Sequence, residues 1–307
     1  MGPELVDANI PSCYYAEGSM DTGEMLLLLE NVNESLPAGV FFGPGNPNNW
    51  AIKAKLPQLC EGNPNAVETT IEAFKLFARM HGKYWMDTTL IEKTWLRATD
   101  WMQGENEISW KQAQTMQSSG WSKIKNQIEN GEATIEWDPH LVACLDVSFQ
   151  KVSNENSFNT YSERMAKNTF TLVQGDCHPH NLLWSKNDQS FRVIDFEMIG
   201  VGPPGQELGQ FVISHMLPAV RRECETTILQ TYFDELQMIL KKKGMENNNY
   251  TIEKLKSEYI NGGVGRWAWF MPFFAGSPPM AQYFHDQLAA FLKDHVKDPN
   301  DSPMPRV

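Results

Sequence analysis

The chain has 307 residues, of which 41% are hydrophobic and 21% are charged. This is the composition of a globular protein with one large or two modest domains. The formal net charge of −12 at pH 7 argues against nucleic acid or an anionic membrane surface as the main partner.

The cysteines and the N-terminus indicate the cellular compartment. The five cysteines are odd in number and widely spaced, which favours reduced thiols over a disulfide framework. The longest apolar run, near residues 25–29, is too short to span a membrane, and nothing at the N-terminus resembles a signal peptide. We therefore expect a cytoplasmic protein.

The N-terminal part of the chain predicts two strands and a loop. Residues 1–24 are polar and rich in turn-forming residues, with one short strand expected at 13–16. The apolar run over 24–32 predicts a buried strand that ends in polar residues. Residues 33–65 are rich in Gly, Pro and Asn, which predicts a long loop that holds one short strand. Lys53 imitates the phosphate-pairing lysine of a kinase, but the prolines before it favour a surface lysine.

Helical patterns dominate most of the remaining chain. Residues 65–85 predict an amphipathic helix, in which we interpret His81 as a structural residue. Residues 86–157 predict several helices rich in tryptophan. Three further helices are expected after the centre of the chain, over 206–216, 223–243 and 251–274.

The end of the chain contains an apolar segment and a polar tail. The last helix is strongly apolar over 267–274, which favours a helix buried against the sheet. An aromatic wall for a cationic or apolar acceptor is the alternative interpretation. Residues 297–307 have the composition of a disordered tail.

The central stretch carries the most informative pattern in the sequence. A short apolar run over 170–173 predicts a buried strand, and Asp176 follows it after a tight turn. Asn181 comes five residues after Asp176, just before another apolar run. A strand over 191–196 then brings Asp195 near its end. This layout predicts a hairpin that carries the three side chains towards one edge.

These three side chains have a specific chemical use. Mg²⁺ prefers hard oxygen ligands in near-octahedral geometry and takes only a few of them from the protein. Asn181 and Asp195 can supply such oxygens, which leaves Asp176 free to hold and deprotonate a hydroxyl nucleophile. This division of roles at this spacing is typical of kinase-type phosphoryl transfer.

Three other interpretations compete with phosphoryl transfer. Asp and Asn side chains often only cap the turns of a surface hairpin, but here three features coincide at the right spacing. A zinc site would use Cys177, His178 and His180, although no second Cys/His cluster completes a four-ligand set. A metal-dependent hydrolase with the same acidic cluster is disfavoured, because the sequence has a single cluster.

The same stretch resembles a known enzyme family. The segment QGDCHPHNLLW, followed by VIDFEMIGVGPPGQELGQF, resembles the aminoglycoside-phosphotransferase and choline-kinase superfamily of kinase-like enzymes. The closest branch is the CHK or ecdysteroid-kinase-like one. The resemblance implies Asp176 as the catalytic base, and Asn181 and Asp195 as ligands of Mg²⁺.

The resemblance also implies a nucleotide-binding hinge and supporting residues. The strand before Val32 resembles the one that leads into the interlobe hinge, so the backbone of Glu30, Asn31 and Val32 would bond the adenine of ATP. A core strand that binds no ligand is the alternative interpretation. The sequence departs from the family at Gln174, where a backbone-shaping histidine is usual. Possible supporting residues are Gln174, His178 and Glu197.

The resemblance covers about residues 12–296, and it begins late in the kinase fold. A full kinase has three strands and a helix ahead of the hinge-like strand, and they carry the phosphate-covering loop and the Lys–Glu pair. We therefore expect an absent or reduced small lobe and a poor catalyst. The expected parts are a remnant of the N-terminal lobe and hinge over 1–32, a kinase-like C-terminal lobe over 33–296 and a tail over 297–307.

Together these patterns predict an α+β, protein-kinase-like fold that consists mainly of the helical C-terminal lobe with a catalytic β-hairpin. The expected activity is ATP- and Mg²⁺-dependent phosphorylation of a hydroxyl group on a small molecule, with neither nucleic acid nor membrane as a partner. The alternative is a truncated or degenerate relative that binds a small molecule or a partner protein without catalysis.

Overall fold

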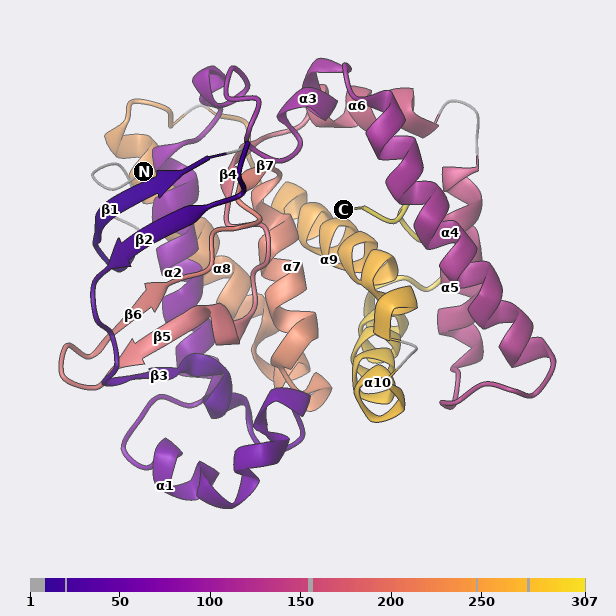
Figure 1. Cartoon of the computed structure of the whole chain (residues 1–307), viewed down its shortest axis with the longest axis horizontal. Helices are drawn as coiled ribbons and strands as arrows, with labels where there is room; N and C mark the ends of the chain where they lie inside the picture. The colour runs from indigo at the N-terminus through magenta and orange to yellow at the C-terminus, as the bar shows by residue number, and fades with distance from the viewer. Residues whose placement is uncertain (1–8, 20, 154–156, 247, 275–276, 307) are drawn as a thin grey trace.

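A computed structural model gives the structure of the chain (Figure 1). It describes residues 9–19, 21–153, 157–246, 248–274 and 277–306. The first eight residues of the expected N-terminal remnant lie outside the described residues. Helices dominate the described part, together with three small antiparallel sheets, so the α+β class expected from the sequence is confirmed.

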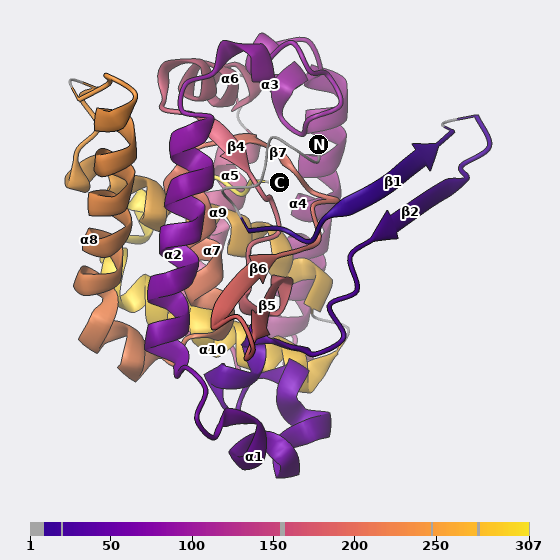
Figure 2. The same cartoon turned by 90° about the vertical axis from the view of Figure 1, so that its left-hand side faces the viewer.

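The first sheet is a hairpin that projects from the body of the molecule (Figure 2). Strands β1 (Cys13–Gly18) and β2 (Met25–Leu29) pair with each other in antiparallel orientation. The expectation of a buried strand here is wrong, because every residue of β2 is exposed, Met25 to 74%. An apolar run predicts the strand itself, but burial needs a second layer against it, and the two strands pair only with each other.

The segment expected as a long loop is mostly helical. After the short strand β3 (Ser35–Pro37), the chain forms the 3₁₀ helices η2 (Ala38–Phe42) and η3 (Pro47–Lys55) and the helix α1 (Leu56–Cys60). Pro47 and Pro57 stand at helix starts, where a missing N–H costs nothing. Lys53 is exposed on η3, so the segment is not the strand that would carry a phosphate-pairing lysine.

The helical body surrounds the central strands. Its helices are α2 (Ala66–Lys83), α7 (Pro204–His215), α8 (Pro218–Lys242), α9 (Ile252–Phe274) and α10 (Pro278–His295). Helix α2 packs along α8, and α7 packs along α9 (Figure 1). Helix α2 begins with a capping box between Asn65 and Glu68, which satisfies backbone N–H groups at its start. No helix among the described residues has the length and apolarity needed to cross a membrane.

Helices α7 and α9 approach each other unusually closely. A Cβ atom on Gly209 of α7 would overlap the carbonyl oxygen of Tyr259 and lie 2.8 Å from the Cα atom of Gly263, both on α9. The backbones of the two helices are therefore in direct contact at this position. This contact fixes the position of α9 relative to the start of α7, which borders the central strands.

A second group of helices lies to one side of the body (Figure 1). These helices are α3 (Thr99–Gln103), α4 (Glu107–Glu129), α5 (Pro139–Val152) and α6 (Ser157–Lys167). The 3₁₀ helix η4 (Thr88–Leu90) precedes them in the chain. The sequence expectation of several helices in this region is confirmed. Trp110 and Trp121 are buried among them, whereas Trp95 is exposed.

The central strands pair differently from the expected hairpin. Strand β4 (Thr171–Val173) is fully buried and pairs with β7 (Gly200–Gly202), not with the strand before Asp195. The hairpin is formed by β5 (Leu182–Ser185) and β6 (Ser190–Val193), and β3 pairs with the other edge of β5. The 3₁₀ turn η5 (Pro179–Asn181) joins β4 to β5. The two sheets therefore meet through loops.

The expectation of a disordered tail is wrong for residues 297–306. A 3₁₀ turn, η6 (Pro299–Asp301), brings Ser302 into hydrogen-bond contact with Ser148 on α5, at 2.8 Å between the hydroxyl oxygens. The amide N–H of Arg306 donates to the carbonyl of Gly265 on α9 at 3.1 Å. Polar composition suggested disorder, but it does not show the docking surface that helices from elsewhere in the chain provide.

Candidate active site

The turn that carries Asp176 has a backbone that glycine alone permits. Gly175 follows β4 with φ of +89°, in a region that other residues rarely adopt. A Cβ atom at this position would overlap the carbonyl oxygen of Met198. The chain therefore turns sharply at the end of a buried strand, and Asp176 lies next to the turn with a half-buried side chain.

A buried network fixes the turn from behind. Glu207, in the first turn of α7, accepts a hydrogen bond from the N–H of Gly175 at 2.8 Å. Its other oxygen lies 2.8 Å from Nε2 of His81, and Nδ1 of that ring lies 2.7 Å from the hydroxyl of Tyr232. His81 is fully buried, which agrees with its interpretation as a structural residue.

The carboxylate of Asp176 is held at both oxygens. Nε2 of Gln210 donates to one oxygen at 3.0 Å, and Nε2 of His178 lies 3.4 Å from the other. Burial would raise the pKa of Asp176, but the hydrogen bond and charge of His178, the charge of Arg266 and the hydrogen bond from Gln210 lower it below its usual value. Asp176 is therefore ionised at neutral pH.

Gln174 connects the loops that carry Asp176 and Asp195. Its amide oxygen accepts from the N–H of Asp176 at 2.9 Å. Its amide nitrogen donates to the carbonyl of Ile194 at 3.2 Å and also to the carbonyl of Asp195. The residue that departs from the family pattern therefore holds the backbone of both loops.

The structure brings the loops of all three predicted residues together. The side-chain amide of Asn181 donates to the carbonyl of Asp176 at 2.9 Å, and the N–H of Ile194 donates to the carbonyl of Asn181 at 3.0 Å. The amide oxygen of Asn181 is then the atom suited to a metal. Asp195 is exposed and has φ of +59°, a strained conformation for an aspartate. Both donors are hard oxygens, which fit Mg²⁺.

A cavity of about 340 Å³ lies beside the turn. Its lining includes Gly175 and the side chains of Arg97, Trp101, Arg266 and Trp269. Arg266 donates to the carbonyl of Gly175 at 3.0 Å, and burial lowers its pKa to about 10 despite the charge of Asp176. The cavity therefore has a cationic and aromatic lining next to an acidic turn.

Glu197 is exposed in the turn after Asp195, and its charge acts on Arg97. Burial lowers the pKa of Arg97, while the charges of Asp176 and Glu197 oppose that effect. Glu197 therefore borders the cavity electrostatically and has no contact that identifies it as a metal ligand among the described residues.

The predicted hinge residues lie in a different place. Glu30, Asn31 and Val32 line a cavity of about 350 Å³ together with residues of the β5–β6 turn. Glu30 forms an ion pair with Arg192 of β6. Among the described residues, none of the three lines the cavity beside Asp176. Their role in binding adenine remains a prediction.

The zinc site that the sequence offered as an alternative would consist of different residues in the structure. Cys177 is buried in the hydrophobic core, where burial raises the pKa of its thiol well above the usual value. His178 and His180 instead lie beside His215, the last residue of α7. The histidine from α7 is 35 positions away from His180, so local spacing gave no signal for it.

The comparison with known families gives a match over residues 97–287. The matching family is DUF1679, described as "Uncharacterized oxidoreductase dhs-27". The chain belongs to this family. A search of the curated proteins finds no match. The region shared with the DUF1679 family contains the turn of Asp176, the loop of Asp195, and Arg97 and Arg266 of the adjacent cavity.

Two solved structures of kinases are also similar to the chain. A glucosamine kinase in complex with glucosamine, ADP and inorganic phosphate aligns with 95% of this chain and 67% of its own, at 13% identity and a TM-score of 0.46. A choline/ethanolamine kinase family protein from Mesorhizobium loti aligns with 94% of this chain and 79% of its own, at 10% identity and a TM-score of 0.29. Both scores are below 0.5, so the chemistry of this DUF1679 member has to be argued from its own residues.

Two arginines of the site lie outside the sequence motif, because Arg266 comes from α9 and Arg97 precedes α3. Gln210 of α7 lies inside the motif, but no role was predicted for it. The signal for Arg266 was present in the sequence, because it opens a strongly apolar run. The interpretation of that run as a buried helix holds for Trp267 and Met271, whereas Trp269 lines the cavity.

Proposed function

We propose that this chain is a phosphotransferase that uses ATP and Mg²⁺ and acts on a hydroxyl group of a small molecule. The observation that supports the proposal is the joining of three loops. Gln174 and Asn181 connect the backbones of the loops that carry Asp176 and Asp195. The loops that carry an ionised carboxylate and two hard oxygen donors are therefore joined to one another, next to a cavity that Gly175 lines.

Asp176 takes the role of the base in this proposal. Its carboxylate is ionised at neutral pH, and its side chain is 31% exposed, so a hydroxyl group can reach it. Gln210 and His178 hold its two oxygens and set its orientation. A base of this kind accepts the proton of the hydroxyl as the oxygen attacks the γ-phosphorus.

Asn181 and Asp195 are the residues that would hold the metal. Mg²⁺, when bound, neutralises charge on the phosphates of ATP. The chain contributes the amide oxygen of Asn181 and the exposed carboxylate of Asp195, and the left-handed backbone of Asp195 sets where that carboxylate lies.

The cavity beside Asp176 indicates the kind of acceptor. Arg97 and Arg266 line it, and the Nε atom of Arg266 is buried without a hydrogen-bond partner among the described residues. Trp101 and Trp269 offer flat apolar surface. A molecule with a carboxylate or phosphate group near its hydroxyl complements this lining better than a cationic one, even though the whole chain has a net negative charge.

The family description names an oxidoreductase, but the architecture does not support one of the nicotinamide type. Dinucleotide-binding folds are open parallel sheets with the pyrophosphate at a helix N-terminus. In the described part of the chain, the sheets have two or three strands, and the paired strands run antiparallel. We therefore do not propose hydride transfer.

Titration calorimetry with ATP in the presence and absence of Mg²⁺ tests the proposal. We expect tighter binding with the metal, and loss of that difference in Asp195→Ala. Asp234→Ala is the matched control, because Asp234 is an exposed aspartate on α8. If Asp195→Ala keeps the full metal dependence, the assignment of Asp195 is wrong. Binding of ATP without turnover of any acceptor would favour the non-catalytic alternative.

A further inference from the structure

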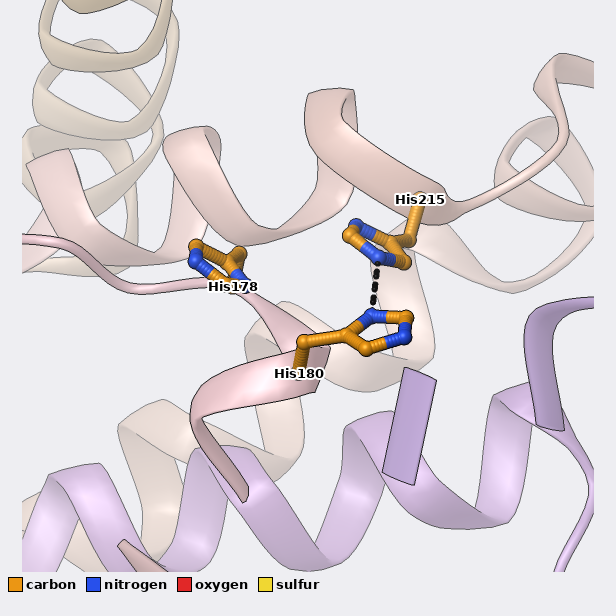
Figure 3. A group of neighbouring side chains, drawn as sticks. All are labelled: His178, His180 and His215. Carbon is orange, nitrogen blue, oxygen red and sulfur yellow. Dashed lines mark hydrogen bonds between the residues drawn. The ribbon is translucent and has the colours of Figure 1, made fainter. Parts of the chain in front are cut away.

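Three of the seven histidines in the sequence gather beside the candidate active site (Figure 3). His178 and His180 lie at the turn η5, and His215 ends α7. One ring nitrogen of each residue lies within 4.8 Å of a ring nitrogen of the other two. Nδ1 of His180 lies 2.8 Å from Nε2 of His215, as the dashed line in Figure 3 marks.

The hydrogen bonds of His215 determine which of its nitrogens is free. The hydroxyl of Ser214 donates to the carbonyl of Phe211 at 2.7 Å, so its oxygen accepts from Nδ1–H of His215 at 2.9 Å. Nε2 of His215 therefore carries a lone pair, and this nitrogen is the one that faces His180. The site thus contains an imidazole whose free nitrogen is already oriented inward.

His178 has the same arrangement on the other side. Its Nε2 lies 3.4 Å from the carboxylate of Asp176, whereas its Nδ1 is buried and has no hydrogen-bond partner among the described residues. A ring nitrogen of His178 is directed towards the pair formed by His180 and His215 (Figure 3). A buried nitrogen without a partner loses the hydrogen bonds that water would give it. A ligand bound to this nitrogen would compensate for those missing hydrogen bonds.

Two of the rings are packed closely against the body of the protein. The ring of Phe42 packs edge-on against His215, with 5.7 Å between the ring centroids. A Cβ atom on Gly39 would overlap the ring of His180, so this ring packs directly against the backbone. Both rings are therefore held in fixed positions, so they would lose little conformational freedom on binding a metal.

We propose that His178, His180 and His215 form a binding site for Zn²⁺. Three imidazole nitrogens favour a borderline-soft ion such as Zn²⁺ over Mg²⁺, which prefers oxygen. Metal-binding histidines usually donate their second N–H to a carboxylate, carbonyl or similar group. Asp176 provides that partner for His178, and Ser214 provides it for His215. Three protein ligands leave one tetrahedral position for water or another ligand.

Binding requires a small rearrangement of the rings. Zn–N bonds are about 2.0–2.1 Å, so the ligand nitrogens of a tetrahedral site lie roughly 3.4 Å apart. The hydrogen-bonded nitrogens of His180 and His215 would move apart, and the proton between them would shift to Nε2 of His180. The nitrogen of His178 would move closer. The proposal does not depend on the proposed phosphotransferase activity, because the site is tested without nucleotide.

Zinc binding to the full chain tests the proposal directly. The chain, freed of metal by dialysis against a chelator, is titrated with Zn²⁺ in competition with a chromogenic indicator. We expect one equivalent of Zn²⁺ per chain. His178→Gln and His215→Gln should each lower the affinity by at least about 10–100-fold, the usual cost of losing a supporting contact alone. Ser214→Ala keeps all three ligands and should lower it about 10-fold.

The matched control is His140→Gln, because His140 is half-buried on α5 and lies outside the cluster. The affinity of this variant for Zn²⁺ should equal that of the unchanged chain. Co²⁺ replaces Zn²⁺ to identify the ligands, and its spectrum should lack the charge-transfer band of cysteine thiolate. Circular dichroism checks that each variant is folded. If the variant of the buried His215 unfolds, the result for His178→Gln decides the test. Absence of Zn²⁺ binding, equal affinity in the His178 variant, or a thiolate band would each overturn the proposal.

Discussion

Strands β2 and β4 both form from short apolar runs, but β2 is exposed to solvent and β4 is buried. The run MLLLL of β2 is exposed along its whole length, whereas the run TLV of β4 is completely buried. Strand β4 pairs with β7 and contacts α2 and α7, whereas β1 is the one strand that pairs with β2 in the described part of the chain. Burial is therefore a property of the layers that meet a strand, and an apolar run alone does not determine it.

The two regions also differ in how their polar groups are satisfied. Behind β4, the hydroxyl of Thr171 donates to the carbonyl of His81 at 2.8 Å, and Glu207 bonds both His81 and the turn that carries Asp176. Loss of one buried residue of this network leaves the remaining polar groups without a hydrogen-bond partner. An isolated two-stranded hairpin such as β1–β2 is only marginally stable. We therefore expect stability to concentrate around β4.

The largest expected effect tests whether the region around β4 has a role in catalysis in addition to its role in stability. Asp176→Asn should reduce any phosphotransfer by about 10²–10⁴-fold, because a general base contributes about that much. The substitution preserves shape and the hydrogen bond from Gln210, so the melting temperature should change little. Steady-state turnover of ATP with a panel of small hydroxyl compounds measures the effect. Retention of most of the activity would remove Asp176 from the mechanism.

The next effect concerns the network behind the turn. Glu207→Ala should lower the free energy of unfolding by about 3–5 kcal/mol, because it leaves His81 and the N–H of Gly175 buried without a partner. Urea unfolding followed by circular dichroism measures it. Glu223→Ala on the exposed face of α8 is the control and should change the value by less than about 0.5 kcal/mol. Similar losses in both variants would contradict the importance of the network.

A buried carboxyl group on α9 should make the free energy of unfolding depend on pH. Glu258 accepts hydrogen bonds from the hydroxyl of Tyr250 and the N–H of Gly205, while its second oxygen is buried without a partner in the described structure. Burial raises the pKa of Glu258 to about 7 from an ordinary value of 4.5. The folded state therefore binds this proton more tightly than the unfolded state, and the stability that it provides decreases as pH rises from 4.5 through 7.

This decrease should amount to about 3 kcal/mol across that range. The measurement is the difference in unfolding free energy between the unchanged chain and Glu258→Gln, determined by urea unfolding at several pH values. The difference should shift in favour of the variant as pH rises, because glutamine cannot ionise. A difference that stays constant between pH 4.5 and 8 would show that Glu258 ionises normally.

The smallest effect comes from a matched pair of leucines. Leu27→Ala in β2 should change the free energy of unfolding by less than about 0.5 kcal/mol, since its side chain is already exposed. Leu172→Ala in β4 should lower it by about 2–5 kcal/mol through loss of burial and creation of a cavity. Thermal and urea unfolding measure both. Equal losses would mean that the hairpin is buried in solution.

The sequence predicted what depends on neighbouring residues. The helical pattern over 65–85 predicted α2, and the spacing of Asp176, Asn181 and Asp195 identified loops that the structure joins. Local patterns carry this information because hydrogen bonds at caps and turns connect residues close in sequence.

The sequence could not predict what depends on distant partners. It did not give the pairing of β4 with β7, the exposure of β2 or the docking of residues 297–306. Arg97 and His215 escaped notice for the same reason, because each meets the site from another element. Arg266 escaped notice as well, although an arginine at the start of an apolar helical run is a local signal of a buried charge with a purpose.

The backbone contact between α7 and α9 has a consequence for motion. With no side chain between Gly209 and Gly263, the two helices have no compressible layer that would let them slide or hinge, so they should behave as one rigid body. Gln210 and Arg266 belong to this body, and their separation should stay constant when a ligand enters. Any closure of the cavity would then come from the opposite wall, where Arg97 and Trp101 approach from the segment around α3.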